Sequence, residues 1–124
     1  MIFGIGIDLV KIERIKRAVE RWHEHFVDRV FTKKEQEYSY RHSNPYQHLA
    51  VRLAAKEAIL KAIGTGWSGG IKWTDIEIIN NEKGSPVAVV SGRVKDLIEL
   101  QGVKEILISL SHDTEYAIAQ AVLI

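Results

Sequence analysis

Four charged side chains interrupt an otherwise apolar segment in the middle of the chain. Positions 52–66 carry the sequence RLAAKEAILKAIGTG, in which the charged residues are Arg52, Lys56, Glu57 and Lys61. Lysine and glutamate are rarely fully buried unless they are paired or bind an ion. A helix with this sequence therefore either borders a cleft or packs its charges against one another.

An acidic residue near the N-terminus could join this helix. Glu57 and Lys61 are one helical turn apart on one face, and the adjacent stripe is mostly alanine. Small side chains permit close packing, so Asp8 could reach Glu57 if the N-terminal segment packs there. Two carboxylates held together repel each other unless a proton or a cation lies between them. Oxygen ligands of this kind suit Mg²⁺, which takes its other ligands from water and phosphates.

Each of these residues also has an ordinary structural explanation. Glu57 and Lys61 could form a surface ion pair that contributes a few tenths of a kcal/mol. Asp8 could cap the helix that follows it. Gly64 is explained by a helix C-cap, without a phosphate-binding loop, and His112 fits a hairpin as well as a catalytic site. No single position decides between these explanations.

The first third of the chain must position Asp8. Residues 2–9 alternate between bulky apolar side chains and a second face with Gly4, Gly6 and Asp8, which predicts a strand. Glycines on that face allow another segment to approach the backbone closely. From Ile12 the apolar residues recur at helical spacing, through Trp22 and on to position 31.

The remaining elements follow from capping residues, turns and periodicity. Thr32 and Glu35 have the spacing of a capping box, which predicts a short helix through Tyr40. The other expected elements are a helix over 46–63, a loop over 67–70, strands over 76–79 and 87–90, a helix over 92–100, and a hairpin of strands 105–111 and 116–123. The sum is one α+β domain over residues 1–124, with a mostly antiparallel sheet packed with a long central helix and shorter helices.

Composition excludes several classes of protein. With 124 residues, a net charge of +1 and no cysteine, the chain suits a single cytoplasmic domain without disulfides or thiolate chemistry. It has no apolar run long enough to span a membrane, and its N-terminus lacks the order of a signal peptide. The small net charge also argues against nucleic acid as the partner. Basic residues instead form a local stripe that faces water: Arg14, Arg17 and Arg21.

Several separated segments together resemble one enzyme family. In chain order they are GIGIDLV at 4–10, FTKKE at 31–35, AKEA at 55–58 within the helix 52–66, WTDIEI at 73–78, GSP at 84–86 and ISLSHD at 108–113. These segments are similar to those of the small stand-alone branch of the 4'-phosphopantetheinyl transferases, the holo-acyl-carrier-protein synthases. The resemblance covers nearly the whole chain and implies the fold of that superfamily.

The resemblance also implies an activity and a catalytic site. The enzyme would transfer 4'-phosphopantetheine from coenzyme A to the serine of an apo acyl carrier protein, in support of fatty acid biosynthesis, and release adenosine 3',5'-bisphosphate. Asp8 and Glu57 would hold Mg²⁺ at the pyrophosphate, and Lys61 would stabilise or protonate the leaving phosphate. Either Glu57 or a metal-bound water could accept the serine proton.

Further residues acquire roles through the same resemblance. Four positions are similar to residues that border the phosphates and nucleotide of the coenzyme: Arg52, Lys56, Thr65 and His112. Guanidinium and imidazole donors suit a phosphate monoester. The stripe formed by Arg14, Arg17 and Arg21 would dock the acidic carrier, although a run of charge is usually a solvated helix face. Family members of this size form homotrimers, with the coenzyme between subunits.

Two other functions remain open from the sequence. The first is a phosphopantetheinyl transferase that serves polyketide or peptide carrier proteins. The second is a non-catalytic module whose basic helix binds an acidic protein or RNA. A binding module explains the arginines but leaves Asp8, Glu57 and Lys61 without a purpose. Metal-dependent binding of coenzyme A would distinguish the enzyme from the module.

Overall fold

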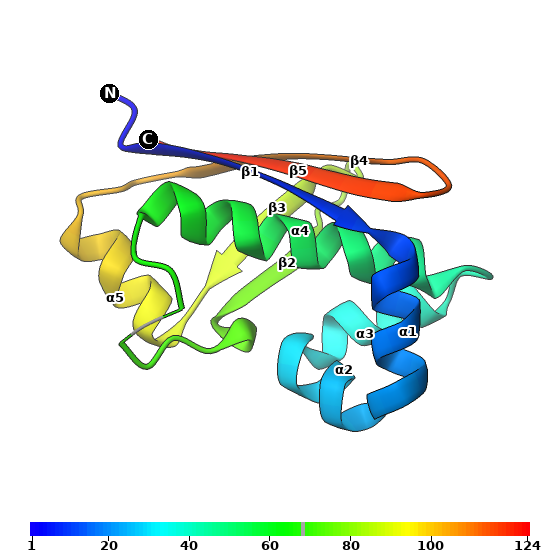
Figure 1. The fold of residues 1–124 in the computed structure, drawn as a ribbon. Coiled ribbons are helices and arrows are strands. Elements are labelled where there is room, and N and C mark those ends of the chain that lie inside the picture. The colour runs from blue at the N-terminus through cyan, green and yellow to red at the C-terminus, as the bar shows by residue number, and fades with distance from the viewer. Residues whose placement is uncertain (68) are drawn as a thin grey trace.

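A long central helix, α4 (Pro45–Ile63), lies between a three-stranded sheet on one side and the remaining elements on the other (Figure 1). The computed structural model describes residues 1–67 and 69–124. The sheet is antiparallel throughout, with the order β1-β5-β4. Its strands are β1 (Gly4–Lys11), β4 (Ile106–His112) and β5 (Tyr116–Leu123). The confirmed fold class is therefore α+β with an antiparallel sheet.

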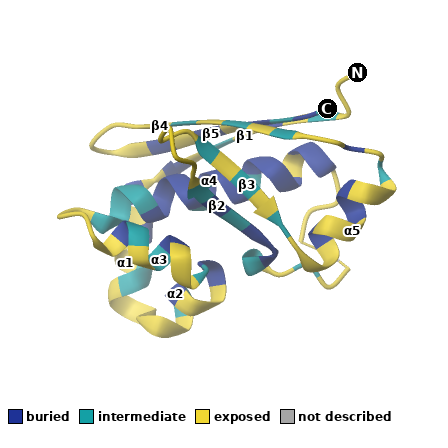
Figure 2. Cartoon of the chain, turned by 180° about the vertical axis from the view of Figure 1, so that it is seen from behind, coloured by how far each residue is buried: buried dark blue, intermediate teal, exposed yellow. Residues whose placement is uncertain are grey.

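The other side of α4 carries a second small sheet and the shorter helices (Figure 1). These elements are α1 (Ile12–Trp22), α2 (Glu24–Val30), α3 (Lys33–Tyr40), the 3₁₀ turn η1 (Trp73–Asp75), β2 (Ile76–Asn80), β3 (Pro86–Val90) and α5 (Gly92–Leu100). Strands β2 and β3 pair antiparallel. Figure 2 shows α4 buried along most of its length, which is typical of a helix enclosed by its neighbours.

The ends of α4 follow the expected capping rules. Pro45 occupies the first turn, where its missing N–H has no helical acceptor to lose. Gly64 ends the helix with φ of 90°, and its N–H donates to the carbonyl of Leu60. The predicted C-cap is therefore confirmed, and the turn that follows α4 begins at Gly64.

Glycine brings β1 unusually close to α4. A Cβ on Gly6 would lie 1.9 Å from the carbonyl oxygen of Ala58, and one on Gly4 would lie 2.0 Å from that of Ala62. The glycine face of β1 therefore lies directly on the helix backbone, which is the close approach that glycines on this face were expected to allow. The bulky face of the strand points outward, and Ile5 and Ile7 are 64% and 56% exposed.

We expect Gly6→Ala to destabilise the fold by about 3 kcal/mol, because the added methyl meets helix backbone that cannot move aside. Urea unfolding measures the change. Gly64→Ala is a matched control: no atom lies within 4 Å of its Cβ position, so the cost is the left-handed backbone alone, about 1 kcal/mol. Equal losses in the two variants would contradict this account of the β1–α4 contact.

Two predictions about the first helical region are corrected. The helical pattern that starts at Ile12 is divided into α1 and α2 by His23, which adopts φ of 49°. Trp22 continues the apolar spacing but is 54% exposed, because the chain turns away immediately after it. Its neighbour Arg21 lies 5.0 Å from the indole ring.

The other predicted elements are present, with ends that differ by a residue or two. The strand predicted over 2–9 begins and ends two residues later, and the Thr32–Glu35 capping box is formed. In the predicted loop 67–70, position 68 lies outside the described residues and the others form turns. None of the helices in residues 1–67 and 69–124 is long and apolar enough to cross a membrane.

Candidate functional site

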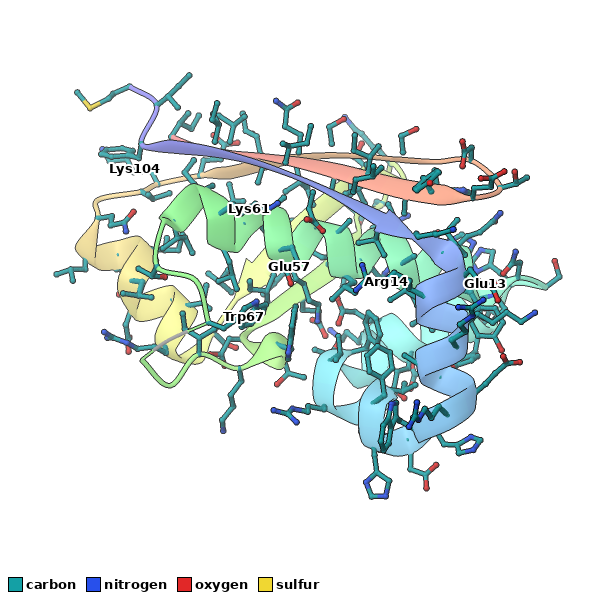
Figure 3. The ribbon with its side chains drawn as sticks, in the orientation of Figure 1. Glu13, Arg14, Glu57, Lys61, Trp67 and Lys104 are labelled. Carbon is teal, nitrogen blue, oxygen red and sulfur yellow. The ribbon has the colours of Figure 1, made fainter. Side chains whose placement is uncertain are left out.

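Asp8 and Glu57 line the same cavity. Asp8 lies in β1, Glu57 lies on α4, and the close β1–α4 contact brings the two segments together. The cavity has a volume of about 350 Å³ and is also lined by Arg14 and by the apolar side chains of Phe26 and Leu53. Figure 3 shows Glu57 and Arg14 between α4 and α1. Two carboxylates and one guanidinium thus face a single space.

Lys61 binds the N-terminal strand. Its ammonium donates to Asp8 Oδ1 at 3.0 Å and to the carbonyl oxygen of Ile7 at 2.9 Å. The Asp8 side chain is 18% exposed and that of Lys61 is 55% exposed. The predicted trio of Asp8, Glu57 and Lys61 is therefore assembled, with the ammonium on Asp8 as well as one turn from Glu57.

The carboxyl group of Glu57 has a perturbed environment. Burial raises the pKa of Glu57, and the negative charge of Asp8 acts in the same direction. The Trp67 side chain and the charge of Lys61 oppose this rise in the pKa. Repulsion between two carboxylates in a cavity is the electrostatic pattern that a bound cation would relieve.

The donor set at this cavity fits Mg²⁺. Within residues 1–67 and 69–124, no cluster of three or more His, Asp or Glu side chains could hold a metal ion. Mg²⁺ is commonly held by only one or two carboxylates, with water and substrate phosphates as its other ligands. Asp8 and Glu57 supply two such carboxylates beside open space.

Arg52 and His112 meet at a second cavity. This space of about 330 Å³ is also lined by Tyr38 and His48, and it shares no lining residue with the cavity of Asp8 and Glu57. The Arg52 guanidinium lies 4.3 Å from the Tyr38 ring and donates to Asn80 Oδ1 at 3.3 Å. Its buried Nε has no hydrogen-bond partner among the described residues. Two of the predicted coenzyme contacts are thus together, but apart from the carboxylates.

His48, which lines this second cavity, makes the stability of the fold depend on pH. Burial, with the neighbouring His42, Arg52 and His112, lowers the pKa of His48 from 6.5 to about 4. Between these values the unfolded chain binds a proton that the folded chain does not, so stability falls as the pH falls from about 6.5 to about 4.

We expect this loss to appear as a falling urea midpoint over that range, and His48→Gln to make the decline shallower. His25→Gln is the matched control, because His25 is exposed and outside the cluster. A decline of the same slope in the His48 variant and in wild type would contradict the assignment.

Lys56 does not occupy the ligand-facing position that the sequence predicted. Its side chain is fully buried, and its ammonium lies 2.7 Å from Glu35 Oε1, 2.6 Å from the carbonyl oxygen of Val30 and 3.2 Å from that of Trp73. Burial lowers the pKa of Lys56, and the Glu35 charge opposes that shift. These three contacts direct the ammonium into the protein interior. Thr65, by contrast, is exposed in the turn after α4.

The three arginines of the basic stripe are exposed, as expected, but they differ in their contacts. Arg14 lines the cavity of Asp8 and Glu57. Arg17 forms an exposed ion pair with Glu13 at 3.4 Å. Arg14 is therefore the member of the stripe that is placed beside the carboxylates.

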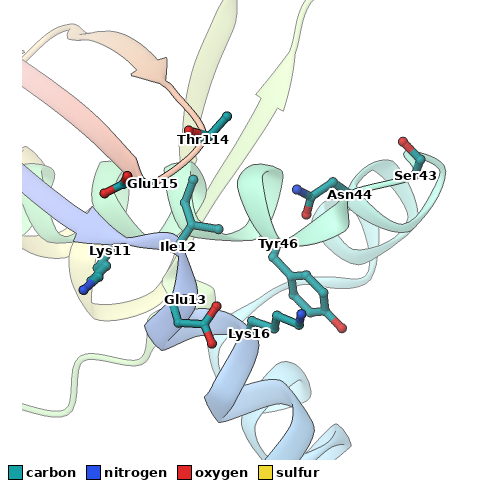
Figure 4. A pocket seen from close by; sticks show the side chains of 9 residues that line it. All are labelled: Lys11, Ile12, Glu13, Lys16, Ser43, Asn44, Tyr46, Thr114 and Glu115. Carbon is teal, nitrogen blue, oxygen red and sulfur yellow. The ribbon is translucent and has the colours of Figure 1, made fainter.

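A third cavity lies where the start of α1 meets the β4–β5 turn (Figure 4). Its volume is about 560 Å³, and it contains none of the predicted site residues. Two lysines and two glutamates line it together: Lys11, Lys16, Glu13 and Glu115. Because positive and negative charges line this cavity in equal number, it does not favour an anionic ligand. The cavity of Asp8 and Glu57 is therefore the candidate active site.

Comparison with known proteins shows the family of the chain. The sequence model of the 4'-phosphopantetheinyl transferase superfamily matches residues 4–121. The chain belongs to this superfamily. A relative in the superfamily, the holo-[acyl-carrier-protein] synthase of Caldanaerobacter subterraneus subsp. tengcongensis, is 43% identical over 95% of this chain and 91% of its own length.

Solved structures of the superfamily share the fold. The holo-[acyl-carrier-protein] synthase of Neisseria meningitidis matches with a TM-score of 0.91 and 32% identity, over 100% of this chain and 99% of that one. The Helicobacter pylori synthase, solved in complex with coenzyme A, matches with a TM-score of 0.85 and 30% identity, over 97% of this chain and 99% of that one.

The side-chain contacts of two further residues, Glu35 and Trp67, were not predicted from the sequence. Glu35 was assigned only to a capping box, and that assignment gave no sign of its bond to Lys56, which is 21 positions away. Trp67 was assigned only to a loop, although its ring packs on that of Trp73 with the centroids 3.5 Å apart. Its position just after the glycine turn of α4 is the sole signal, and a weak one.

Proposed function

We propose that this chain is a single domain that transfers the 4'-phosphopantetheine group of coenzyme A to the serine of an apo acyl carrier protein. Adenosine 3',5'-bisphosphate is the other product, and the holo carrier serves fatty acid biosynthesis. The observation that carries the proposal is the meeting of Asp8 and Glu57 at one cavity, with Lys61 bonded to Asp8. Relatives in the same superfamily match this chain over nearly its full length, and they are named after this activity.

The transfer is a displacement at phosphorus. The serine oxygen bonds to the β-phosphorus of coenzyme A, the bond from that phosphorus to the bisphosphate oxygen breaks, and the hydroxyl proton is released. Catalysis of such a step is mostly positioning and neutralisation of charge. Bound Mg²⁺ supplies Lewis acidity and a template at the diphosphate. Asp8 and Glu57 hold this ion, while the Lys61 ammonium stabilises or protonates the leaving phosphate.

We assign the second cavity to the nucleotide end of coenzyme A, with Arg52 and His112 as contacts. The buried Nε of Arg52, which has no partner among the described residues, supports a ligand there. Since this cavity shares no lining residue with that of Asp8 and Glu57, one coenzyme molecule engages both sets most simply when they come from neighbouring subunits.

A homotrimer with the active sites between subunits meets this requirement. Support comes from the outer face of the three-stranded sheet, which presents an exposed apolar surface: Ile5, Ile7, Leu9, Leu107 and Ile118. Surfaces of this kind mark interaction sites. Thr65 is proposed to border the coenzyme phosphates, whereas the buried contacts of Lys56 support a structural role for it. The absence of cysteine is in keeping with a reducing cytoplasm as the location.

The activity is tested by intact-mass spectrometry. Purified protein is incubated with coenzyme A, Mg²⁺ and a panel of apo carriers from fatty acid, polyketide and peptide synthesis. We expect the fatty acid carrier to gain the mass of one phosphopantetheine, and to gain none when the metal is chelated. If no carrier gains mass while an authentic transferase modifies the same samples, the proposal fails.

The carrier is proposed to dock on Arg14, Arg17 and Arg21, with Arg14 nearest the carboxylates. We expect Arg14→Glu to slow carrier association about tenfold and to reduce its salt dependence, because acidic carriers are steered by positive charge. Surface plasmon resonance measures the association rate. Lys104→Glu makes the same charge change at the far end of the molecule (Figure 3). An equal effect of the two variants, or an equal loss of coenzyme binding, would reject the docking role.

A further inference from the structure

A buried positive charge without a carboxylate of its own borders the second cavity. Arg52 is 2% exposed, and it belongs to no ion pair within residues 1–67 and 69–124. Burial lowers the pKa of Arg52 and the charge of Glu35 opposes this shift, but that carboxylate is already paired with Lys56. The described residues that line the cavity include no Asp or Glu. A buried cation of this kind favours an anionic ligand.

Three imidazole rings gather at the same cavity. The ring centroids of His42 and His48 are 3.8 Å apart, and those of His48 and His112 are 5.9 Å apart. His42 is held in place by its Nδ1–H, which donates to the carbonyl oxygen of Tyr38 at 2.8 Å. His48 and His112 line the cavity together with Arg52, whereas His42 does not line it. His48 is therefore the ring that contacts both other imidazoles and also faces the open space.

The groups around His48 keep its imidazole neutral in the free protein. The titratable and charged side chains that face it are Tyr38 and His42 from α3 and the turn after it, Arg52 from α4, and His112 from β4. Burial, His42, Arg52 and His112 together lower the pKa of His48 to about 4. None of these groups is a carboxylate, so the negative charge that would favour the imidazolium has to come from a ligand.

A phosphate monoester bound by Arg52 and His112 lies beside the His48 ring, because all three side chains line one space of about 330 Å³. The negative charge of the phosphate favours a proton on the imidazole, and the imidazolium can donate a hydrogen bond to it. We propose that His48 is a further contact for the phosphate monoester of coenzyme A, which it binds as the imidazolium, so that the coenzyme enters this cavity together with a proton. This inference rests on the function proposed above.

Proton uptake makes the affinity for the coenzyme depend on pH. The bound phosphate raises the pKa of His48 above its value in the free protein, so proton and ligand strengthen each other's binding. The contribution of His48 to affinity therefore grows as the pH falls from the pKa of the complex toward that of the free protein. Above the higher of the two values, this contribution no longer changes with pH.

The contact is tested by nuclear magnetic resonance of the histidine side chains, with inorganic sulfate as the probe. Sulfate remains a dianion throughout the titration range of histidine, and chloride at the same ionic strength is the reference. We expect sulfate to raise the midpoint of His48 by about one pH unit and to leave that of the exposed His25 in place. Coenzyme A is expected to raise the midpoint of His48 in the same direction. If neither anion moves His48 more than His25, the proposal is overturned.

The coupling to coenzyme binding is tested by isothermal titration calorimetry in buffers of different ionisation enthalpy, which counts the protons taken up. A phosphate monoester itself titrates near pH 6, so wild type is compared with His48→Gln at each pH. We expect wild type to take up more protons than the variant, by at most about one. The ratio of the dissociation constants, variant over wild type, should grow by up to about tenfold for each unit by which the pH is lowered between the two midpoints.

Two controls assign the proton to His48. His42→Gln removes the neighbouring ring that does not line the cavity, and it should keep the proton uptake of wild type. Dephospho-coenzyme A lacks the phosphate monoester and should bind without the extra proton. Equal uptake in wild type and His48→Gln, or loss of uptake only in His42→Gln, would overturn the proposal.

The outcomes also distinguish this inference from the proposed function. If the protein transfers phosphopantetheine but the midpoint of His48 responds to no anion, the inference fails and the function stands. If sulfate raises that midpoint but coenzyme A does not bind, the function fails and the contact between His48 and a bound dianion stands.

Discussion

Replacing either carboxylate by its amide, Asp8→Asn or Glu57→Gln, is expected to lower the rate of phosphopantetheine transfer about 10³-fold. Each replacement removes one of the two charged oxygen ligands at the shared cavity, and metal catalysis contributes several kcal/mol of charge stabilisation to reactions of this type. The amides keep the size of the side chains, so the fold should survive. Initial rates under saturating coenzyme A, with circular dichroism of each variant, measure both effects.

Glu13→Gln is the matched control for this pair. Glu13 lies on α1 in an exposed ion pair with Arg17, so its amide should transfer at the wild-type rate. Excess Mg²⁺ should rescue the two active-site variants only in part, because one ligand is permanently lost. Wild-type rates in both Asp8→Asn and Glu57→Gln would remove the basis for the metal site.

Replacing the buried ammonium, Lys56→Met, is expected to lower the free energy of unfolding by about 3 to 5 kcal/mol. The change leaves Glu35 fully buried without its cation, and it deprives the carbonyl oxygens of Val30 and Trp73 of a donor. Glu35 would retain hydrogen bonds from the backbone N–H groups of Thr32 and Ile78. Urea unfolding followed by circular dichroism measures the loss.

Two comparisons make the Lys56 result specific. Lys61→Met removes an ammonium that is 55% exposed, so its cost should be about 1 kcal/mol or less. The double variant Lys56→Met/Glu35→Gln should lose less than the sum of the single losses, because the uncompensated charge is gone. A loss below about 1 kcal/mol in Lys56→Met would mean that the buried pair contributes little to stability.

The sequence predicted the elements that bring the carboxylates together, because those elements have regular periods. Alternation over 2–9 indicated which face of β1 was bare, and the alanine stripe of α4 indicated where that face could pack. The sequence offered the meeting of Asp8 and Glu57 only on the condition that this strand packs on that stripe, and the structure meets the condition. Their assembly at one cavity is the part of the site that sequence reasoning reached.

Features that depend on contacts between distant residues could not be predicted in this way. A helical wheel could not predict the ion pair of Lys56 with Glu35. It places Lys56 one turn from Arg52, but it does not show which other segment packs on that face. The separation of α1 from α2 depends on the positive φ of His23. A histidine in the sequence does not by itself predict this conformation. The packing of Trp67 on Trp73 depends on a turn, and a turn has no hydrophobic period from which it could be predicted.

The glycine face of β1 also restricts the register in which this strand can pair with β5. Gly6 pairs opposite Ala121, and its bare Cα rests on the carbonyl of Ala58. Sliding β1 by one residue past β5 would drive Ile5 or Ile7 into that carbonyl and turn Asp8 away from Lys61. The helix backbone thus acts as a template that rejects the misaligned strand, so the carboxylate pair can form only when the chain is correctly folded.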